Sequence, residues 1–276
     1  MIDAALPHLR CPVCEDTLNR PANEQSLHCP RGHSFDLARQ GYASLVAGRT
    51  PHSGDTAEMI TARESFLAAG HYSFIAAALS SAVATTKNTT FVLDAGVGTG
   101  YYLGSLLDRL PEAAGLGLDV SKPALRRAAR AHPRAAAALA DIWQRLPVAD
   151  GCASVILNVF APRNGPEFHR VLRPGGVLLV VTPAAGHLRE LIDTYGLIGV
   201  DPDKAQRVTH TLGEHFTATT TSTLEERLKL TGNEVATLIG MTPSARHVAV
   251  DDLPADQVEV TAAVDLTVYQ RVGAFK

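Results

Sequence analysis

From Thr89 onward, short apolar runs alternate with segments of helical periodicity, and this alternation restricts the fold more than any other feature of the chain. Strands that alternate with helices predict a parallel, doubly wound α/β sheet of the Rossmann-like class. Uninterrupted apolar runs are typical of strands buried on both faces. The expected strands are Phe91–Leu93, Gly115–Val120, Ala135–Ala140, Ser154–Val159 and Val177–Val181, and the expected helices between them are Tyr102–Leu110 and Pro123–His132.

Outside the alternating region, the periodicity is helical early in the chain and less regular in its last third. Apolar residues at helical spacing over 56–85 predict helices that Gly70 interrupts. Near the C-terminus we expect helices at Leu188–Leu197 and Glu225–Thr231, and a strand that ends the stretch Val258–Tyr269.

The composition is that of a globular chain without a bulk electrostatic preference. The 276 residues leave room for one large domain and a small one, and 46% hydrophobic against 19% charged residues predicts a buried core. A net charge of −3 leaves only local patches for any nucleic-acid contact. The first residues lack a basic region followed by an apolar run, and no stretch of about 18 apolar residues occurs, so we expect a cytoplasmic protein with no membrane partner.

Three of the four cysteines lie close together near the N-terminus, which in a cytoplasmic protein favours metal ligation over a disulfide. Two Cys/His pairs on neighbouring tight turns can complete a tetrahedron, and thiolates with one imidazole favour zinc in a closed, structural site. The alternatives are reduced cysteines in a small core, and His28 as the fourth ligand. Cys152 is distant and is expected to be a buried apolar residue. The predicted ligands are Cys11, Cys14, Cys29 and His33.

A turn with three glycines follows the first strand of the alternating region, and glycines let the backbone approach a ligand closely. A dinucleotide-binding turn is one interpretation, but that fingerprint needs a glycine at Tyr101 and has no special use for Asp94. An acid at the loop entrance suits the amino group of S-adenosylmethionine, so we favour the methyl donor over a nicotinamide. The predicted cofactor-binding residues of this turn are Asp94, Gly96, Gly98, Thr99, Gly100 and Tyr101.

Two further carboxylates at the ends of expected strands are predicted to bind the cofactor. Asp119 lies where a carboxylate accepts both ribose hydroxyls, although it or Ser121 could instead cap the next helix. Asp141 lies where it can accept from the adenine amino group, or it serves a turn, and the sequence does not separate these roles. Trp143 either stacks near the adenine or packs in the core.

The segment Asn158–Asn164 follows the fourth strand, and ligands of open parallel sheets bind outside the carboxyl ends of the strands. An acceptor base is therefore expected there. Asn158 offers a donor and an acceptor, and Phe160 offers an aromatic face, although Pro162 could simply form a strand-to-helix turn. We predict Asn158 and Pro162 as catalytic residues, and Asn158 also as a cofactor-binding residue, while the role of Phe160 stays open.

Basic residues recur at intervals of four between positions 122 and 134, with no acidic residue among them. On one helix they would form a continuous positive face that could contact RNA phosphates. The alternative is an ordinary solvated face, which is the more common meaning of such a run. The residues are Lys122, Arg126, Arg127, Arg130 and Arg134.

The order of these motifs resembles that of the 23S rRNA (guanine-N1)-methyltransferases, over nearly the whole chain. The sequence of the segment Asn158–Asn164 is most similar to that of the Gram-positive, tylosin-resistance-type branch of the family. Thr99 departs from the pattern, since many relatives have an acid there. Further matching stretches are His33–Leu45, Gly54–Asp55, Met59, Ala62–Arg63, Phe66–Leu67, Gly70–Tyr72, Leu118–Pro123 and Met241–Ser244.

The resemblance implies a class I methyltransferase sheet with a small N-terminal zinc ribbon. We divide the chain into a zinc-binding domain (1–48), a linker with connecting helices (49–86) and an S-adenosylmethionine-dependent methyltransferase domain (87–276). The resemblance further implies a homodimer with structural Zn²⁺, whose zinc modules help to recognise the RNA. The resemblance also implies that this enzyme methylates N1 of a guanine in a domain II hairpin loop of 23S rRNA and thereby affects macrolide binding.

For such an enzyme we expect direct in-line transfer to a base turned out of its loop, without a covalent intermediate. Two rival functions remain open at this point. One is a small-molecule methyltransferase, because the fold serves many substrates. The other is a non-catalytic, zinc-dependent module that binds RNA or protein.

Overall fold

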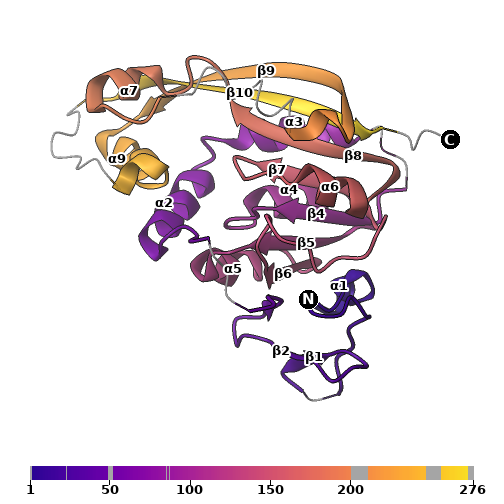
Figure 1. The fold of residues 1–276 in the computed structure, drawn as a ribbon. Coiled ribbons are helices and arrows are strands. Elements are labelled where there is room, and N and C mark those ends of the chain that lie inside the picture. The colour runs from indigo at the N-terminus through magenta and orange to yellow at the C-terminus, as the bar shows by residue number, and fades with distance from the viewer. Residues whose placement is uncertain are drawn as a thin grey trace.

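The computed structural model describes residues 2–22, 24–48, 52–84, 86, 88–199, 211–246 and 256–272. Within these residues, one sheet has eight strands in the order β3-β6-β5-β4-β7-β8-β10-β9 (Figure 1). The strands from β3 to β8 in this order run parallel, and β10 pairs antiparallel with both β8 and β9. The strands are β3 (Ala43–Ser44), β4 (Phe91–Ala95), β5 (Ala114–Asp119), β6 (Ala135–Leu139), β7 (Ala153–Val159), β8 (Leu172–Pro183), β9 (Phe216–Leu230) and β10 (Val258–Arg271).

This arrangement confirms the predicted doubly wound, mostly parallel sheet. Successive side chains of a strand point to opposite faces. In β4, Val92 therefore belongs to one core cluster and Leu93 to the other. Helices α3, α4 and α5 contribute to the first cluster, and α1 and α6 to the second, so the central strands are covered on both sides. These helices are α1 (Ile2–Ala5), α3 (Ser73–Val83), α4 (Tyr101–Arg109), α5 (Lys122–Ala128) and α6 (Gly165–Val171).

The N-terminal segment forms a small lobe at one end of the sheet (Figure 1). The lobe contains the antiparallel hairpin of β1 (Ser26–His28) and β2 (Ser34–Asp36). Before it, α1 and the short helix η1 (Leu6–His8) lead into the lobe, and Ile2 packs in the main core. After it, β3 joins the main sheet beside β6. The lobe is therefore anchored to the body at both of its ends.

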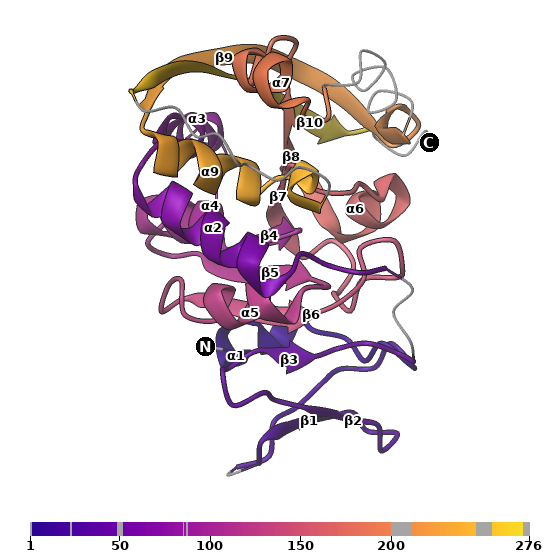
Figure 2. The same cartoon turned by 90° about the vertical axis from the view of Figure 1, so that its left-hand side faces the viewer.

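Two helices occupy the segment between the lobe and β4, as the periodicity predicts. Helix α2 (Ala57–Ala68) begins at Thr56, whose Oγ1 accepts a hydrogen bond from the Met59 amide. Gly70 then separates α2 from α3 with a φ of 85°, a left-handed conformation that favours glycine. Figure 2 shows α2 lying beside α9 (Gly232–Gly240), and the two helices are in contact.

The described helices include none that is long and apolar enough on its own to span a membrane. Helices α2 and α3 pass that test only when they are taken together, and the pair is bent by 75°.

One secondary-structure prediction in the last third is wrong, and two are confirmed. The sequence predicts a helix over Glu225–Thr231, because Leu, Glu, Arg and Lys favour helices. Most of that segment instead extends β9, where antiparallel pairing with β10 provides backbone partners. The helix starts later, because Thr231 and Glu234 form a capping box at the start of α9. The predicted helix near Leu188, observed as α7 (Arg189–Tyr195), and the C-terminal strand β10 are confirmed.

The continuous basic face predicted for positions 122–134 is also wrong, because α5 ends at Ala128. Beyond it, the guanidinium of Arg134 donates to three backbone carbonyls at and after the end of α4, so this cation is structural. Arg127 is paired with Glu64 at 2.8 Å between Nε and Oε2. The basic residues of the run that stay exposed are Lys122, Arg126 and Arg130.

Candidate functional site

The four predicted metal ligands meet at one point of the N-terminal lobe. Their ligand atoms all lie within 4.8 Å of one another, with 3.6 Å between the Sγ atoms of Cys14 and Cys29 and 3.2 Å between Cys29 Sγ and His33 Nδ1. Tetrahedral zinc with Zn–S bonds of about 2.3 Å needs ligand atoms roughly 3.5 to 4 Å apart. The donor set fits structural zinc, and the spacing of the ligand atoms is close to the tetrahedral one. The cluster consists of Cys11, Cys14, Cys29 and His33.

The local fold leaves His28 and Cys152 outside the cluster. The second ligand pair sits on a tight turn in which the Gly32 amide donates to the Cys29 carbonyl at 3.0 Å. His28 lies outside the cluster, with its Nε2 atom 2.7 Å from Glu24 Oε2. Cys152 lies against the main core, where burial raises the pKa of its thiol to about 11.

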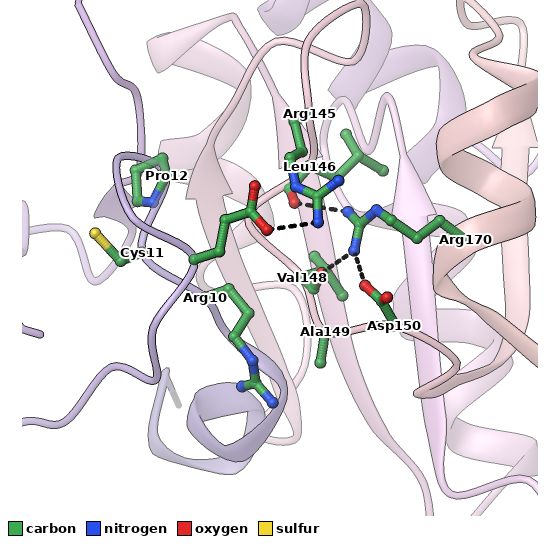
Figure 3. Close-up of a pocket in the computed structure, with 10 residues that line it drawn as sticks. Arg10, Cys11, Pro12, Arg145, Leu146, Val148, Ala149, Asp150 and Arg170 are labelled. Atoms are coloured by element: carbon green, nitrogen blue, oxygen red, sulfur yellow. Dashed lines mark hydrogen bonds and ion pairs between the residues drawn. The ribbon is translucent and has the colours of Figure 1, made fainter.

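A pocket lies at the junction between the lobe and the main body (Figure 3). Arg145 of the body reaches Glu15 of the lobe, at 2.7 Å between Nη2 and Oε2. A backbone bridge also joins Leu9 to Val148. The residues that line this pocket include none of those predicted to bind the cofactor. We therefore assign it to the interface that fixes the lobe on the body.

The glycine-rich turn joins β4 to α4 and has the backbone conformation that the sequence predicts. A Cβ atom on Gly96 would lie 2.3 Å from the Cβ of Ala161, so this position must be glycine. Gly98 differs, because a Cβ there would meet only the side chain of Arg63. Its amide donates to Oδ2 of Asp119 at 2.9 Å. The φ angles of Gly96, Gly98 and Gly100 are 92°, 55° and 85°.

Two carboxylates flank this turn, the buried Asp94 and the partly buried Asp119. Burial and the charge of Asp119 raise the pKa of Asp94 to about 8, and burial raises the pKa of Asp119. Such a pair favours a bound cation. S-adenosylmethionine carries a sulfonium and an ammonium group, so the charges of the site fit this cofactor. Within the described part of the chain, Tyr102 Oη and Asn158 Oδ1 are buried without a hydrogen-bond partner, which also points to a polar ligand.

Asp119 ends β5 and is not the cap of the following helix. Its two carboxylate oxygens accept from the amides of Gly98 and Ser121, the latter at 2.8 Å. The cap is Ser121, whose Oγ accepts from the Ala124 amide at 3.3 Å. Capping therefore does not explain the Asp119 carboxylate, which faces the cofactor turn.

Asp141 follows β6 and is almost fully buried. Its Oδ1 accepts from the amide of Trp143 at 3.0 Å, which is the turn role that the sequence left open. Its Oδ2 lies 2.7 Å from Nδ1 of His52. Trp143 is 50% exposed, so the alternative that its ring packs in the core is wrong.

At the end of β7, the buried side chain is Asn158 and the exposed one is Phe160. The Asn158 amide group donates to the carbonyls of Ala95 and Pro162, at 3.1 and 2.7 Å, and so ties β4 to the loop after β7. Phe160 is 40% exposed and has a φ of 52°, which is unusual for a residue with a side chain. Strain of this kind is a pointer to function.

Two other aromatic rings lie next to the side chain of Phe160. The ring centroids of Tyr72 and His187 lie 6.3 and 6.2 Å from that of Phe160. Nδ1 of His187 accepts from the Ala263 amide at 3.1 Å, which holds this ring in place. The result is one exposed aromatic ring, supported by two buried ones, at the edge of the sheet where an acceptor is expected.

Sequence reasoning missed a segment that covers the cofactor side of the sheet, residues 52–63, which we call the strap. Besides the contact of His52 with Asp141, the carbonyl of Asp55 accepts from Ser121 Oγ at 2.7 Å. Farther along, Nη1 of Arg63 lies 2.6 Å from Asp55 Oδ2. The strap therefore touches the strand ends after β4, β5 and β6. Gly54–Asp55 and Arg63 are among the stretches that match the family, but no local pattern in the sequence places them at the cofactor turn.

The sequence matches two known families. Residues 9–53 match a zinc-ribbon family described as RlmA, N-terminal, and residues 92–176 match a methyltransferase domain. Among solved structures, a similar fold occurs in a complex between the Haloferax volcanii Trm112 methyltransferase activator and a methyltransferase. The matching chain has a TM-score of 0.53 at 16% identity, over 80% of this chain and 100% of that one. The fold and site together define a class I methyltransferase that uses S-adenosylmethionine and carries a structural zinc ribbon.

Two relatives from actinomycetes match over nearly their full lengths. One from Micromonospora griseorubida, named as a 23S rRNA (guanine-N1)-methyltransferase, is 55% identical over 97% of this chain and 98% of its own. The 23S rRNA (guanine(748)-N1)-methyltransferase of Streptomyces fradiae is 43% identical over 94% of this chain and 93% of its own. The chain belongs to the family of 23S rRNA (guanine-N1)-methyltransferases.

Proposed function

We propose that this protein transfers the methyl group of S-adenosylmethionine to N1 of a guanine in the domain II hairpin loop of 23S rRNA. We further propose guanine 748 as the position, on the strength of 43% identity with the Streptomyces fradiae enzyme. The structural observation that carries the proposal is the exposed ring of Phe160, whose backbone has a positive φ, beside the cofactor turn. An unpaired base turned out of its loop can stack on such a ring.

In this proposal, Asp94 binds the amino group of the cofactor, Asp119 the ribose and Asp141 the adenine. The remaining loop residues, Gly96 to Tyr101, shape the backbone around it. When bound, S-adenosylmethionine supplies an electrophilic methyl group. Asn158 and Pro162 hold the loop that presents Phe160, because the Asn158 amide group bonds the Pro162 carbonyl. Positioning of the two reactants then contributes most of the rate enhancement.

The RNA would be held by local patches. Lys122, Arg126 and Arg130 are exposed on and after α5 and can contact phosphates. The lobe that holds zinc is fixed to the body through the Arg145–Glu15 ion pair, so it can present a second RNA surface in a set orientation. We propose that the chain is divided as predicted from the sequence, into a zinc-binding domain (1–48), a linker with connecting helices (49–86) and a methyltransferase domain (87–276).

We also propose that the enzyme is a cytoplasmic homodimer and that its methyl group weakens binding of tylosin-type macrolides. The dimer would present two copies of the exposed basic patch to one RNA. Size-exclusion chromatography with light scattering tests this, since a dimer has twice the chain mass of 29.3 kDa. Macrolide susceptibility of a sensitive strain that expresses the protein tests the second part.

The experiment that tests the proposed function is incubation of the protein with S-adenosylmethionine and unmodified 23S rRNA, followed by primer extension. N1-methylguanine blocks the Watson–Crick edge, so reverse transcription should stop beside guanine 748. An Asp94→Asn variant is the control and should give no stop. Cofactor binding without any stop would favour a small-molecule acceptor, and no cofactor binding would favour a non-catalytic module.

A further inference from the structure

The cofactor site described above contains three carboxylates for one ligand, Asp94, Asp119 and Asp141. These acids suit the amino group, ribose and adenine of S-adenosylmethionine. The amino-acid end of that cofactor also carries a carboxylate, which none of the three can bind in ionised form. A positively charged or hydrogen-bond-donating partner is therefore required near the glycine-rich turn.

Arg63 in the strap is in the right place to be that partner. A Cβ atom built on Gly98 would lie 3.5 Å from Nη1 of Arg63, so the guanidinium lies over the central glycine of the turn. The charge of Arg63 also lowers the pKa of Asp119, in opposition to burial. The cation therefore faces the same space as the acids that are assigned to the cofactor.

The Arg63 guanidinium is held from two sides. Its Nη1 atom lies 2.6 Å from Asp55 Oδ2, and its Nη2 atom donates to the Met241 carbonyl at 3.0 Å. The guanidinium group has five N–H donors, and these two contacts do not use all of them. The Asp55 carboxylate occupies a position that a ligand carboxylate could share or take over.

A second donor lies close by in the first turn of α4. The Tyr102 hydroxyl is buried and, among the residues that the structure describes, has no hydrogen-bond partner. Burial raises the pKa of Tyr102 well above its ordinary value, and the charges of Arg63 and Asp94 act on it in opposite directions, so both groups lie near the hydroxyl. A buried hydroxyl without a partner is costly unless a ligand supplies one.

We propose that Arg63, assisted by the Tyr102 hydroxyl, binds the carboxylate of the amino-acid end of S-adenosylmethionine. This deepens the proposed function and rests on it. The strap thereby becomes part of the cofactor site, and Asp55 orients the cation. The competing explanation is that Arg63 only cross-links the strap to Met241 near the end of α9.

Ligand pairs separate these two explanations. Decarboxylated S-adenosylmethionine keeps the sulfonium, the amino group and the adenosine but lacks the carboxylate. A carboxylate-binding residue affects only the complete cofactor, whereas a structural cross-link affects both ligands equally. Calorimetric titration of both ligands into the full-length zinc-loaded protein gives the two dissociation constants without any methyl transfer.

For Arg63→Gln, we expect Kd for S-adenosylmethionine to rise about 10- to 100-fold, as for loss of charged hydrogen bonds, and Kd for the decarboxylated ligand to change less than about twofold. Tyr102→Phe should give the same selectivity with a smaller loss, about three- to tenfold, and removes only one oxygen atom. Arg127→Gln is the matched control, because Arg127 pairs with Glu64 of the same helix as Arg63, and both affinities should stay unchanged.

Equal losses for both ligands in Arg63→Gln and Tyr102→Phe would overturn the proposal, and so would unchanged affinity for S-adenosylmethionine in both variants. If the wild-type protein itself binds neither ligand, the proposed function fails, and this proposal fails with it. If the wild-type protein binds both ligands equally well, only the carboxylate assignment is lost.

Discussion

The zinc centre and the cofactor site show two different ways of building a site from one chain. The zinc ligands span 22 positions, from Cys11 to His33, and two tight turns bring them together. The cofactor site joins residues that are far apart in sequence, as in the contact between His52 and Asp141 across 89 positions. A local site can be recognised from spacing alone, whereas a site assembled by the sheet needs the fold first.

The two sites also differ in what they demand from the chain. The zinc cluster is closed by four protein ligands, so it contributes to stability. Among the described residues, the cofactor site carries buried carboxylates and two buried polar atoms without partners, which a bound ligand can satisfy. If this contrast is right, variants at the first site should change folding, and variants at the second should change binding.

The largest effect is expected from loss of a zinc ligand. Cys14→Ser should lower the zinc content from one ion per chain to nearly none and unfold the lobe, because zinc binding contributes on the order of 10 kcal/mol to the folding of such modules. Metal analysis and limited proteolysis measure the two effects. Cys152→Ser, outside the cluster, should keep its zinc. A Cys14→Ser protein with one zinc per chain would contradict the assigned ligand set.

The next largest effect is expected from Asp94 at the cofactor turn, where a substitution should change cofactor binding more than folding. Asp94→Asn should raise Kd for S-adenosylmethionine by about 100-fold, because it removes a buried charge from a charge pair. In the ligand-free protein, the pKa of Asp94 is raised from 3.8 to about 8. The folded state then holds a proton that the unfolded state has lost, so stability falls as the pH rises from 3.8 to about 8.

The same substitution should therefore stabilise the protein without cofactor at the upper end of that pH range, while it weakens cofactor binding. Thermal melts at about pH 5 and about pH 8 should show a smaller pH-dependent loss in Asp94→Asn than in the wild type. Asp193→Asn, at an exposed position of α7, serves as the control and should behave like the wild type. Wild-type affinity for the cofactor in Asp94→Asn would remove this residue from the site.

A smaller effect is expected on the acceptor side, where binding of the base and binding of the cofactor can be separated. Phe160→Ala should slow methyl transfer to rRNA by about 10- to 100-fold, since stacking on one base is worth about 1–3 kcal/mol. Affinity for S-adenosylmethionine should not change. Ile198→Ala removes another exposed apolar side chain and should leave transfer intact. An equal loss of cofactor affinity in Phe160→Ala would place the ring in the cofactor site instead.

The smallest effect concerns the exposed basic residues. The double variant Arg126→Gln, Arg130→Gln should weaken rRNA binding at every position alike and lower the slope of log K against log salt by about 2. Filter binding at several salt concentrations measures this slope. Arg127→Gln should have less effect, because that cation is already paired with Glu64. An unchanged slope in the double variant would mean that this patch faces solvent only.

The sequence was sufficient for the features that depend on local patterns. Apolar runs predicted the five parallel strands from β4 to β8, since a strand buried on both faces must be apolar throughout. Alternating glycines predicted the cofactor turn, where Gly96 has no room for a side chain. The Cys/His spacing predicted the zinc cluster, and Gly70 marked the break between α2 and α3.

The predictions that were wrong or missing concern features that depend on contacts between distant parts of the chain, which a local sequence pattern does not contain. Glu225–Leu230 has the composition of a helix, but pairing with β10 decides its conformation. Arg134 continues a basic run, yet the end of α5 turns it toward backbone carbonyls. The strap residues match the family in sequence, but only the fold shows that Arg63 lies over Gly98.

The central claim is that this chain methylates N1 of a guanine in 23S rRNA. Its most direct test is transfer of a deuterated methyl group from labelled S-adenosylmethionine to unmodified 23S rRNA, with mass spectrometry of the digested nucleosides. We expect labelled N1-methylguanosine at close to one per rRNA, in a fragment from the domain II hairpin, and none with Asp94→Asn. Label in a different nucleoside, or no label in RNA from a protein that binds the cofactor, would contradict it.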